Sequence, residues 1–348
     1  MSLPAATRVA VVFNDDAGAL TIGEEKDRIA VAGAATAAAA VAKALVARGH
    51  LAVTIPARAD PIELAATLRA SGADVVFNLV EGFAGKARLE GAVSGLFDLL
   101  AIRYTGNPPA TAYLAQDKER AKAVLRAAGV PVPAGTVLAW AQAPLPAGLG
   151  WPLFVKLRYE DASHGISARN LCADEAALRI RAGELIESYR QDVLVEDFLP
   201  GREFNAAILD EPGGPTVLPI AELDYSKLPR DHPPVLTYDA KWLEDSPAYL
   251  QTPVVYPKLD QALWGDVVGT ALKAFHALGC RGYARVDLRL DRDGRPVVLE
   301  VNPNPDISPD AGFARAASRA GIGYEELVDR IVRTALGSLE HDPARRGG

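Results

Sequence analysis

Hydrophobic and polar residues alternate over residues 282–302, and this alternation predicts a β-hairpin with one apolar and one polar face. Asp293-Gly294, near the middle of the stretch, is a strong signal for a two-residue turn. With that turn as the loop, Arg292 pairs with Arg295. Counting back from this pair predicts which residues of the two strands oppose each other.

The polar face of this hairpin gathers four residues that could do chemistry. The register brings Arg285 opposite Asn302, and Asp287 opposite Glu300. Opposed carboxylates lie about 5 Å apart and repel each other unless a cation lies between them. Two carboxylates and an amide suit Mg²⁺, which usually completes its shell with water and phosphate oxygens; the alternative is a solvated face with incidental acids. The other face is interpreted as core and consists of Val286, Leu288, Leu290, Val297, Leu299 and Val301.

Strands and helices alternate in the first third of the chain. This alternation predicts a parallel sheet with helices on both faces, forming a first domain. The strands are expected at 8–13, 51–55 and 73–79, and the helices at 29–48, 61–70 and 90–101.

The rest of the chain predicts mixed α and β structure. A charged amphipathic helix is expected from Asp117 to Ala128, and from Gly201 onward the pattern indicates antiparallel strands. Residues 224–256 look irregular, and the polar tail at 340–348 is predicted to be disordered. Further strands are expected at 152–157 and 192–199, and further helices at 174–188, 260–278 and 324–336.

Composition narrows the class of protein. The 348 residues are too many for one ordinary core, so two or three domains are expected. The net charge of −7 argues against a nucleic-acid partner, which would call for basic patches. The two cysteines, Cys172 and Cys280, match no metal or redox spacing, which fits a reduced cytoplasmic setting with both thiols buried.

No membrane partner is expected either. The first residues lack the basic and apolar regions of a signal peptide. Residues 29–47 are nearly uncharged, but alanine contributes little hydrophobicity and Lys43 interrupts the run. We interpret this stretch as a buried, closely packed helix.

Several common catalytic signatures are missing from the sequence. It contains no Walker A motif, no Gly-x-Gly-x-x-Gly after a strand, no His-Glu-x-x-His and no Gly-x-Ser-x-Gly. A serine hydrolase would have to rely on Ser163-His164, and adjacent residues rarely form such a pair.

Lys156 lies in the predicted strand 152–157, where an unpaired ammonium would be costly, so an anion must lie near it. That anion is either a carboxylate on a neighbouring strand or a phosphate. The loop that follows carries Ser163 and Gly165, and its small residues and backbone N–H groups could cover phosphates like a lid.

Glu196 and Glu203 flank an apolar dipeptide, Phe198-Leu199. Carboxylates in this setting could accept hydrogen bonds from a ribose while backbone groups meet the edge of a base. The alternative is that both are surface acids.

Taken in order, these pieces resemble the ATP-grasp superfamily and, within it, the D-alanine–D-alanine ligase family. The resemblance covers nearly the whole chain, and the order and combination of the segments are specific although no single segment is. It runs through DVVFNLVEG, LLAIRYTGNPPATAYLAQDKERAKAVLRAAGVPVP, LFVKL, VEDFLPGREFNAAIL, YDAKW, GYARVDL, VLEVNPNPDISP and AGFARAASRAGIGYEELVDRIV.

The resemblance implies an α/β and α+β fold. A Rossmann-like (pre-ATP-grasp) domain would span residues 1–113, followed by the two lobes of an ATP-grasp fold with ATP between them. The central lobe would span 114–200, and the C-terminal lobe with the metal site 201–339, before the tail at 340–348.

The resemblance also implies ATP as a cofactor and assigns residues to it. Lys118 and Lys156 would hold the α- and β-phosphates, and Lys241 would reach the γ-phosphate from a mobile loop. Glu203 would bind the ribose. The adenine edge would be met by the backbone of Glu196, Asp197, Phe198 and Leu199.

By the same resemblance, Asp287, Glu300 and Asn302 would hold two Mg²⁺ ions, or Mn²⁺, with Glu300 bridging them. Arg285 would contact the acyl intermediate. The candidate catalytic residues are Arg285, Lys241 and Ser163.

The implied activity is that of an acid–amino-acid ligase, which needs no protein nucleophile. A substrate carboxylate attacks the γ-phosphorus of ATP, and an amine then attacks the acyl phosphate so that an amide forms and phosphate leaves. The partners are small-molecule carboxylate and amine substrates, such as amino acids or a dipeptide. Members of the family are often homodimers, so a homodimer is expected.

The sequence departs from the family pattern around the amino-acid pocket. Ala162 replaces a serine, Trp242 replaces a tyrosine, Glu81 replaces a histidine, and Asp306 replaces a glycine. The expected glutamate after the first strand has only Glu24 and Glu25 nearby, in an unfamiliar context.

Because a site built for one substrate rejects another strongly, these departures predict a different substrate pair. The alternatives are a genuine D-alanine–D-alanine ligase, another ATP-grasp enzyme of carboxylase or phosphotransferase type, and a nucleotide-binding protein without catalysis. The last would need a degraded metal face, whereas all four residues of that face are present.

Overall fold

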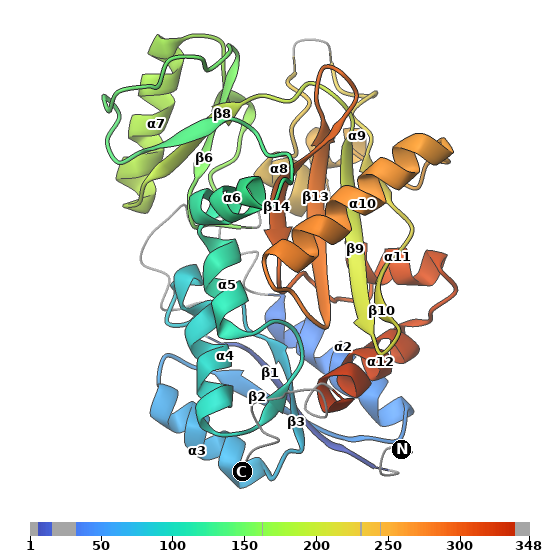
Figure 1. The fold of residues 1–348 in the computed structure, drawn as a ribbon. Helices are drawn as coiled ribbons and strands as arrows, with labels where there is room; N and C mark the ends of the chain where they lie inside the picture. Colours follow the sequence, from blue (N-terminus) through green and yellow to red (C-terminus); the bar gives the residue numbers. More distant parts are fainter. Residues whose placement is uncertain (1–5, 16–32, 162, 230–231, 244, 338–348) are drawn as a thin grey trace.

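The structure is a computed structural model that describes residues 6–15, 33–161, 163–229, 232–243 and 245–337. Three predictions fall outside these residues, namely the tail at 340–348, the pair Glu24 and Glu25, and Ala162. Three β-sheets form the framework, with the N-terminal sheet at the bottom of the view and the other two above it (Figure 1). No helix in the described ranges is long and apolar enough to cross a membrane.

The N-terminal sheet is parallel, as predicted, with strand order β2-β1-β3-β4. Successive residues of β1 pack on opposite faces of the sheet. Val9 packs with α2 on one face, and Ala10 packs with α3 and α4 on the other. Helices therefore cover both faces of the sheet. The elements are β1 (Arg8–Asn14), α2 (Ala34–Ala47), β2 (Leu51–Ala57), α3 (Pro61–Ser71), β3 (Val75–Leu79), α4 (Glu90–Leu99) and β4 (Arg103–Tyr104).

The alanine-rich helix α2 is amphipathic rather than buried all round, which corrects the prediction. Val41 and Leu45 are fully buried, whereas Val46 is 59% exposed. Its buried face packs against α12 (Tyr324–Gly337), near the end of the described chain (Figure 1). The same core includes Leu209 and thereby joins the N-terminal sheet to the sheet that carries the hairpin.

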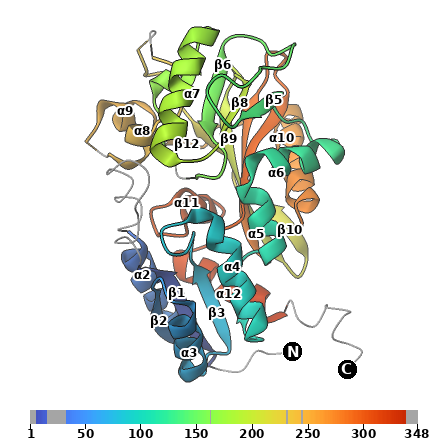
Figure 2. The same ribbon diagram turned by 90° about the vertical axis from the view of Figure 1, so that its left-hand side faces the viewer.

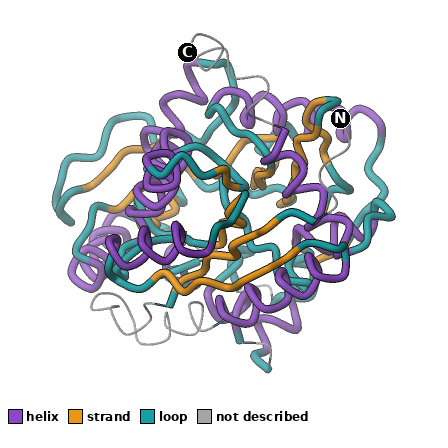
Figure 3. Tube along the Cα trace, turned by 90° about the horizontal axis from the view of Figure 1, so that it is seen from below, coloured by secondary structure: helices purple, strands orange, loops and turns teal. Residues whose placement is uncertain are grey.

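The other two sheets lie on either side of the upper part of the molecule (Figure 1). One is a four-stranded antiparallel sheet with the order β5-β8-β6-β7, and the other is a six-stranded sheet with the order β12-β11-β9-β13-β14, in which β10 pairs with β9. Two helices, α5 (Pro109–Gln116) and α6 (Lys118–Ala127), lead up to them from the N-terminal sheet (Figure 2). Seen from below, helices lie around the strands (Figure 3).

The four-stranded sheet consists of β5 (Gly135–Leu138), β6 (Leu153–Leu157), β7 (Leu171–Cys172) and β8 (Val193–Asp197), covered by α7 (Glu175–Tyr189). The six-stranded sheet consists of β9 (Glu203–Glu211), β10 (Gly214–Val217), β11 (Ala221–Leu223), β12 (Val254–Val255), β13 (Tyr283–Leu290) and β14 (Pro296–Asn302), covered by α10 (Gln261–Ala277). The remaining helices are α8 (Tyr238–Trp242), α9 (Pro247–Gln251) and α11 (Gly312–Arg319), so the segment at 224–256 has more regular structure than predicted.

The turn of the hairpin differs from the prediction. Asp291 donates its N–H to the carbonyl of Arg295 at 2.9 Å, so the loop has three residues, 292–294, and Arg292 does not pair with Arg295. Gly294 has φ of 78°, which suits the left-handed position at the end of such a loop. The prediction failed because a two-residue and a three-residue loop can share the same Asp-Gly signal.

A bulge then restores the predicted register. Leu288 pairs with Val298, while Asp287 pairs with Glu300, so Leu299 is the extra residue. Val298 takes the core position that was predicted for Leu299, which is only half-buried. The prediction that Val297 belongs to this core is also wrong. Val297 is buried, but it pairs with Arg289 on the polar face.

Replacement of Gly201 by alanine is expected to destabilise the junction between the two upper sheets. A Cβ atom there would lie 2.6 Å from both Cβ and the backbone oxygen of Leu290, so backbone would have to move. The expected cost is about 1–3 kcal/mol, seen as a lower Tm. Gly213→Ala is the control, because no atom lies within 4 Å of its added Cβ; equal Tm values for the two variants would contradict the prediction.

Candidate active site

The polar face of the hairpin is centred on Asp287, which opposes Glu300 as predicted. Arg285 donates to both carboxylate oxygens of Asp287, at 2.7 and 2.8 Å. The amide of Asn302 donates to one of these oxygens at 3.0 Å, and that of Asn205 to the other at 2.8 Å. The register from sequence is therefore confirmed for all four residues of the face.

Glu300 is the anion on which the surrounding cations converge. Burial alone would raise its pKa, but the charges of Lys118, Lys156, Arg285 and Lys241 outweigh burial and lower the pKa to about 2. Its carboxylate is ionised at any physiological pH. The four cations come from α6, β6, β13 and α8, so the site is assembled from both upper sheets and the helices beside them.

Lys118 is buried at the start of α6 and is held by acidic and carbonyl oxygens. Its ammonium donates to Asp161 Oδ1 at 2.9 Å and to the carbonyl of Glu160 at 2.5 Å, and lies 3.8 Å from Glu300. Burial would lower its pKa, but the neighbouring acids, Asp161 first among them, raise it above the ordinary lysine value. Lys118 therefore presents a permanent positive charge beside the hairpin.

Lys156 forms an ion pair with Glu196 on the neighbouring strand β8. A carboxylate on a neighbouring strand was one of the two partners predicted for this lysine. Its Nζ lies 2.9 Å from Glu196 Oε1, and Lys122 donates to the other oxygen of Glu196. All three residues are buried, so Glu196 is not a surface acid and that interpretation is wrong. Burial lowers the pKa of Lys122 to about 8, and Lys156 adds to this effect, although Glu196 opposes it.

Glu203 is likewise buried, which corrects the second surface assignment. Tyr225 donates its hydroxyl to Glu203 at 2.9 Å, and Arg289 lies 3.3 Å from the same carboxylate. Burial raises the pKa of Glu203, and Arg289 opposes this rise. The guanidinium of Arg289 also lies 4.7 Å from the centre of the Phe198 ring, so an aromatic and a cationic group flank this acid.

The segment proposed for the adenine edge lies at and just beyond the end of β8. Asp197 donates its N–H to the carbonyl of Ala134 at 2.9 Å, and Phe198 donates to Pro152 at 3.4 Å. Within the described part of the chain, Leu199 donates its N–H to no other backbone carbonyl. A backbone donor next to the Phe198 ring is therefore available for a ligand.

Lys241 lies in α8 with its ammonium 5.3 Å from the ring centre of Trp242. Burial and Arg285 lower its pKa, while Glu300, Asp287 and Glu81 oppose that shift. Trp242, which stands where the family pattern has a tyrosine, thus contacts Lys241 by a cation–π interaction.

Ser163 is a turn residue in the structure. Its φ is 61°, and its carbonyl accepts the N–H of Ile166 at 3.0 Å. Among the described residues, His164 Nε2 has no hydrogen-bond partner and Nδ1 lies 3.4 Å from Glu160, so Ser163 forms no catalytic hydrogen bond with His164. A role for Ser163 stays a prediction.

The donor set on the hairpin fits magnesium in its chemistry. Asp287 and Glu300 oppose each other, and Asn302 adds an amide, so hard oxygen ligands are available. Both oxygens of Asp287 accept from Arg285, so a metal there would compete with this ion pair. In the described ranges, no three histidine, cysteine, aspartate or glutamate side chains gather as a metal cluster, so an amide or phosphate oxygen is required.

Four residues of the site were not predicted from the sequence: Asn205, Lys122, Asp161 and Arg289. The alternation that selected Arg285 and Asp287 also selects Arg289, two positions further along the same face. No comparable pattern pointed to Asn205. This residue lies in β9, a separate segment of the chain, and it pairs with Asp287 because β9 and β13 are neighbours in the sheet.

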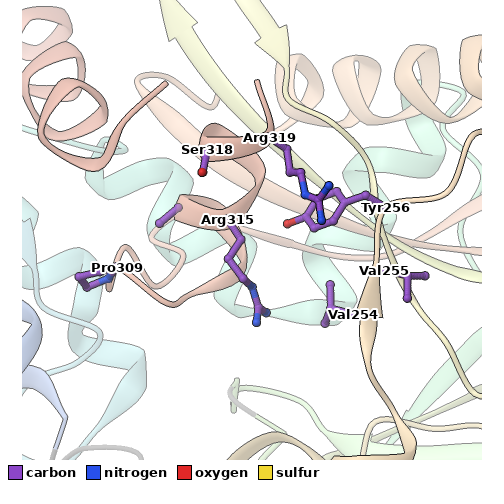
Figure 4. A pocket seen from close by; sticks show the side chains of 8 residues that line it. Val254, Val255, Tyr256, Pro309, Arg315, Ser318 and Arg319 are labelled. Atoms are coloured by element: carbon purple, nitrogen blue, oxygen red, sulfur yellow. The ribbon is translucent and has the colours of Figure 1, made fainter. Parts of the chain in front are cut away.

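A cavity of about 450 Å³ lies apart from these residues, between β12 and α11 (Figure 4). Arg319 lies beside the ring of Tyr256, at 5.1 Å from its centre, and Arg315 comes from the same helix (Figure 4). Pro309 connects this cavity to the loop after the hairpin. The candidate residues from the sequence are not among those that line it.

Comparisons with known proteins agree on one family. The sequence profile described as "D-ala D-ala ligase C-terminus" matches residues 126–333. A D-alanine–D-alanine ligase from Desulforudis audaxviator is 33% identical over 300 residues, covering 85% of this chain and 91% of the relative. The uncharacterized protein y4sG from Sinorhizobium fredii is 35% identical over 268 residues, covering 77% of this chain and 75% of the relative.

Solved structures agree in fold. The D-alanine–D-alanine ligase from Bacillus anthracis complexed with ATP matches with a TM-score of 0.73 and 23% identity, over 96% of this chain and 99% of that one. The enzyme from Coxiella burnetii matches with a TM-score of 0.71 and 19% identity, over 99% and 98%. The predicted fold is confirmed by this likeness and by the sheets described above. The chain therefore belongs to the D-alanine–D-alanine ligase family of ATP-grasp ligases.

Proposed function

We propose that this ligase activates a substrate carboxylate with ATP and joins it to an amine, using a substrate pair other than two molecules of D-alanine. The observation that carries the proposal is the convergence of four cations on Glu300. Three of them also have a closer carboxylate partner, with which a bound triphosphate would share them.

The nucleotide would extend from the four-stranded sheet toward the hairpin. Lys118 and Lys156 would bind the α- and β-phosphates, and Lys241 the γ-phosphate. Glu203 would accept from the ribose, and Leu199 would donate to the adenine beside Phe198. The ATP complex of the Bacillus anthracis ligase supports nucleotide binding in this fold.

Asp287, Glu300 and Asn302 would hold magnesium. When bound, the metal would neutralise charge on the transferred phosphoryl group. Arg285 would stabilise the oxyanion that forms when the amine attacks the acyl phosphate. Lys241 and the loop that carries Ser163 would keep water away from this intermediate.

The substrate pair is inferred from residues close to these groups. Trp242 contacts Lys241, and Glu81 acts electrostatically on the same lysine. Both positions differ from the family pattern, as does Asp306. A pocket with changed charge and hydrogen-bonding groups rejects the original substrate strongly.

Substrate-dependent release of ADP tests the proposal. We expect ADP release from Mg²⁺-ATP only when a carboxylate and an amine are both present, with the amide product identified by mass spectrometry. D-alanine as the sole substrate should give little product. Formation of D-alanyl-D-alanine at a rate typical of cell-wall ligases would contradict the proposed substrate pair, and ADP release without an amine would contradict the ligase reaction.

A further inference from the structure

Arg289 is a buried arginine on the polar face of the hairpin, and the roles proposed above do not use it. It is only 4% exposed. It lies in β13 directly opposite Glu203 in β9, the acid proposed to bind the ribose. Because a buried guanidinium is costly unless anions or carbonyls surround it, its partners show what holds it in place.

Two other segments of the chain hold this guanidinium. Its Nε donates to the carbonyl of Gly201 at 3.0 Å, and Nη2 donates to the carbonyl of Pro234, just before α8, at 2.7 Å. Nη1 lies 3.3 Å from Glu203 Oε2. The ring centres of Phe198 and Tyr225 lie 4.7 and 5.5 Å from the guanidinium carbon. Because the guanidinium is planar and its nitrogens point in fixed directions, these contacts fix its orientation.

The two oxygens of the Glu203 carboxylate have different surroundings. Oε2 accepts from the hydroxyl of Tyr225 at 2.9 Å and is also the oxygen that faces Arg289. Within the described part of the chain, Oε1 accepts no hydrogen bond. One oxygen is therefore held by the protein, and the other is left to accept from a ligand.

The charge of Arg289 also acts on Glu203. Burial raises the pKa of Glu203, and Arg289 is the strongest influence against this rise. An ionised carboxylate accepts a stronger hydrogen bond from a hydroxyl than a neutral acid does. Loss of Arg289 would therefore release Oε2 and favour the neutral form of the acid at the same time.

We propose that Arg289 is a positioning residue of the nucleotide site. It holds the carboxylate of Glu203 by one oxygen, so that the other accepts hydrogen bonds from the ribose hydroxyls of the nucleotide. Arg289 acts through Glu203 rather than by contact with the nucleotide. This inference rests on the proposed function, since it concerns the residue assigned there to the ribose.

Binding of ADP and its deoxy analogues tests the inference without a carboxylate or amine substrate. Calorimetry in the presence of Mg²⁺ compares ADP with 2′-deoxy-ADP and 3′-deoxy-ADP, so that the ratio of Kd values reports the contribution of each ribose hydroxyl. We expect the unaltered protein to bind ADP about 10- to 100-fold more tightly than at least one analogue. In Arg289→Met, which keeps the bulk of the side chain but loses its charge and donors, this ratio should fall below about 3-fold.

Three further variants make the test specific. Arg202→Met is the matched control and should keep the full ratio, because Arg202 precedes Glu203 in the chain but pairs with Glu222 at 2.7 Å. Arg289→Lys keeps the charge without the planar fork and should give an intermediate ratio; it replaces Arg289→Met if that variant fails to fold. In Glu203→Gln, adding Arg289→Met should change the ratio no further, because the charged acceptor through which Arg289 acts is absent.

The ratio separates positioning from a merely structural role. If Arg289 only stabilised the fold, its replacement would weaken ADP and both analogues equally and leave the ratio unchanged, and that result would overturn the inference. If the unaltered protein binds all three nucleotides equally, the ribose assignment of Glu203 fails together with this inference. The ligase reaction is tested independently, because these ratios involve no turnover and the release of ADP with a carboxylate and an amine does not depend on them.

Discussion

Replacing Glu300 by glutamine is expected to reduce kcat by at least about 10³-fold while the fold is retained. The substitution keeps the shape of the side chain but removes the anion on which four cations converge. It also removes the ligand that would bridge the two metal ions. Turnover should be measured as ADP release at saturating ATP, and Mg²⁺-dependent ATP binding by calorimetry.

The fold should survive because three of the four neighbouring cations keep a closer carboxylate partner. Lys118 retains Asp161 at 2.9 Å, and Arg285 retains Asp287 at 2.7 Å. Glu211→Gln is the control, since Glu211 lies in the same sheet and its ion pair among the described residues is with the surface residue Arg330. Near-normal turnover of Glu300→Gln would count heavily against the metal assignment, and a collapse of Tm would indicate a structural role instead.

Replacing Glu196 by alanine is expected to cost about 3–5 kcal/mol of stability. Its carboxylate is 3% exposed and accepts from Lys156 and Lys122, so its removal leaves two buried ammonium groups without their shared partner. The Tm should fall by about 5–10 °C, measured by thermal unfolding. The cost should be smaller at pH 9 than at pH 7, because a buried lysine without a partner loses its proton more readily.

Two further variants make this prediction specific. Glu187→Ala removes an exposed acid from α7 in the same part of the molecule and should leave Tm nearly unchanged. Adding Lys122→Met to Glu196→Ala should recover part of the lost stability, because one of the two unpaired charges is then absent. The same Tm for Glu196→Ala and Glu187→Ala would show that the buried ion pairs contribute little.

Local patterns accounted for most of the elements. The parallel sheet followed from apolar runs that alternate with helices, and the ends of α3 and α7 fall within one residue of the predicted ends. Small helices in the segment at 224–256 were missed, because five-residue helices leave too short a pattern to recognise. The buried face of α2 was predicted, but its exposed face was not, since alanine is compatible with both.

The hairpin shows how a correct register can follow from an incorrectly predicted loop. The loop has one residue more than predicted, and the bulge at Leu299 adds one residue to the other side of the ladder. The two changes cancel before Asp287 and Glu300 are reached. A shift of one residue would have turned the polar face into the core, so the apolar side of the strands selects the register that was predicted.

By itself, the sequence determined the order of the elements, the family, and the four residues that share the hairpin face, because alternation within one hairpin is a local property of the chain. Only the tertiary structure decided that Glu196 lies between two lysines, that Asn205 binds Asp287, and that Asn304 joins the loop after β14 to the loop after β3. These contacts join strands and loops that are far apart in the chain, and they depend on how three sheets pack together. Burial then sets the charge state of each group, and burial is a property of that packing rather than of any short stretch of sequence.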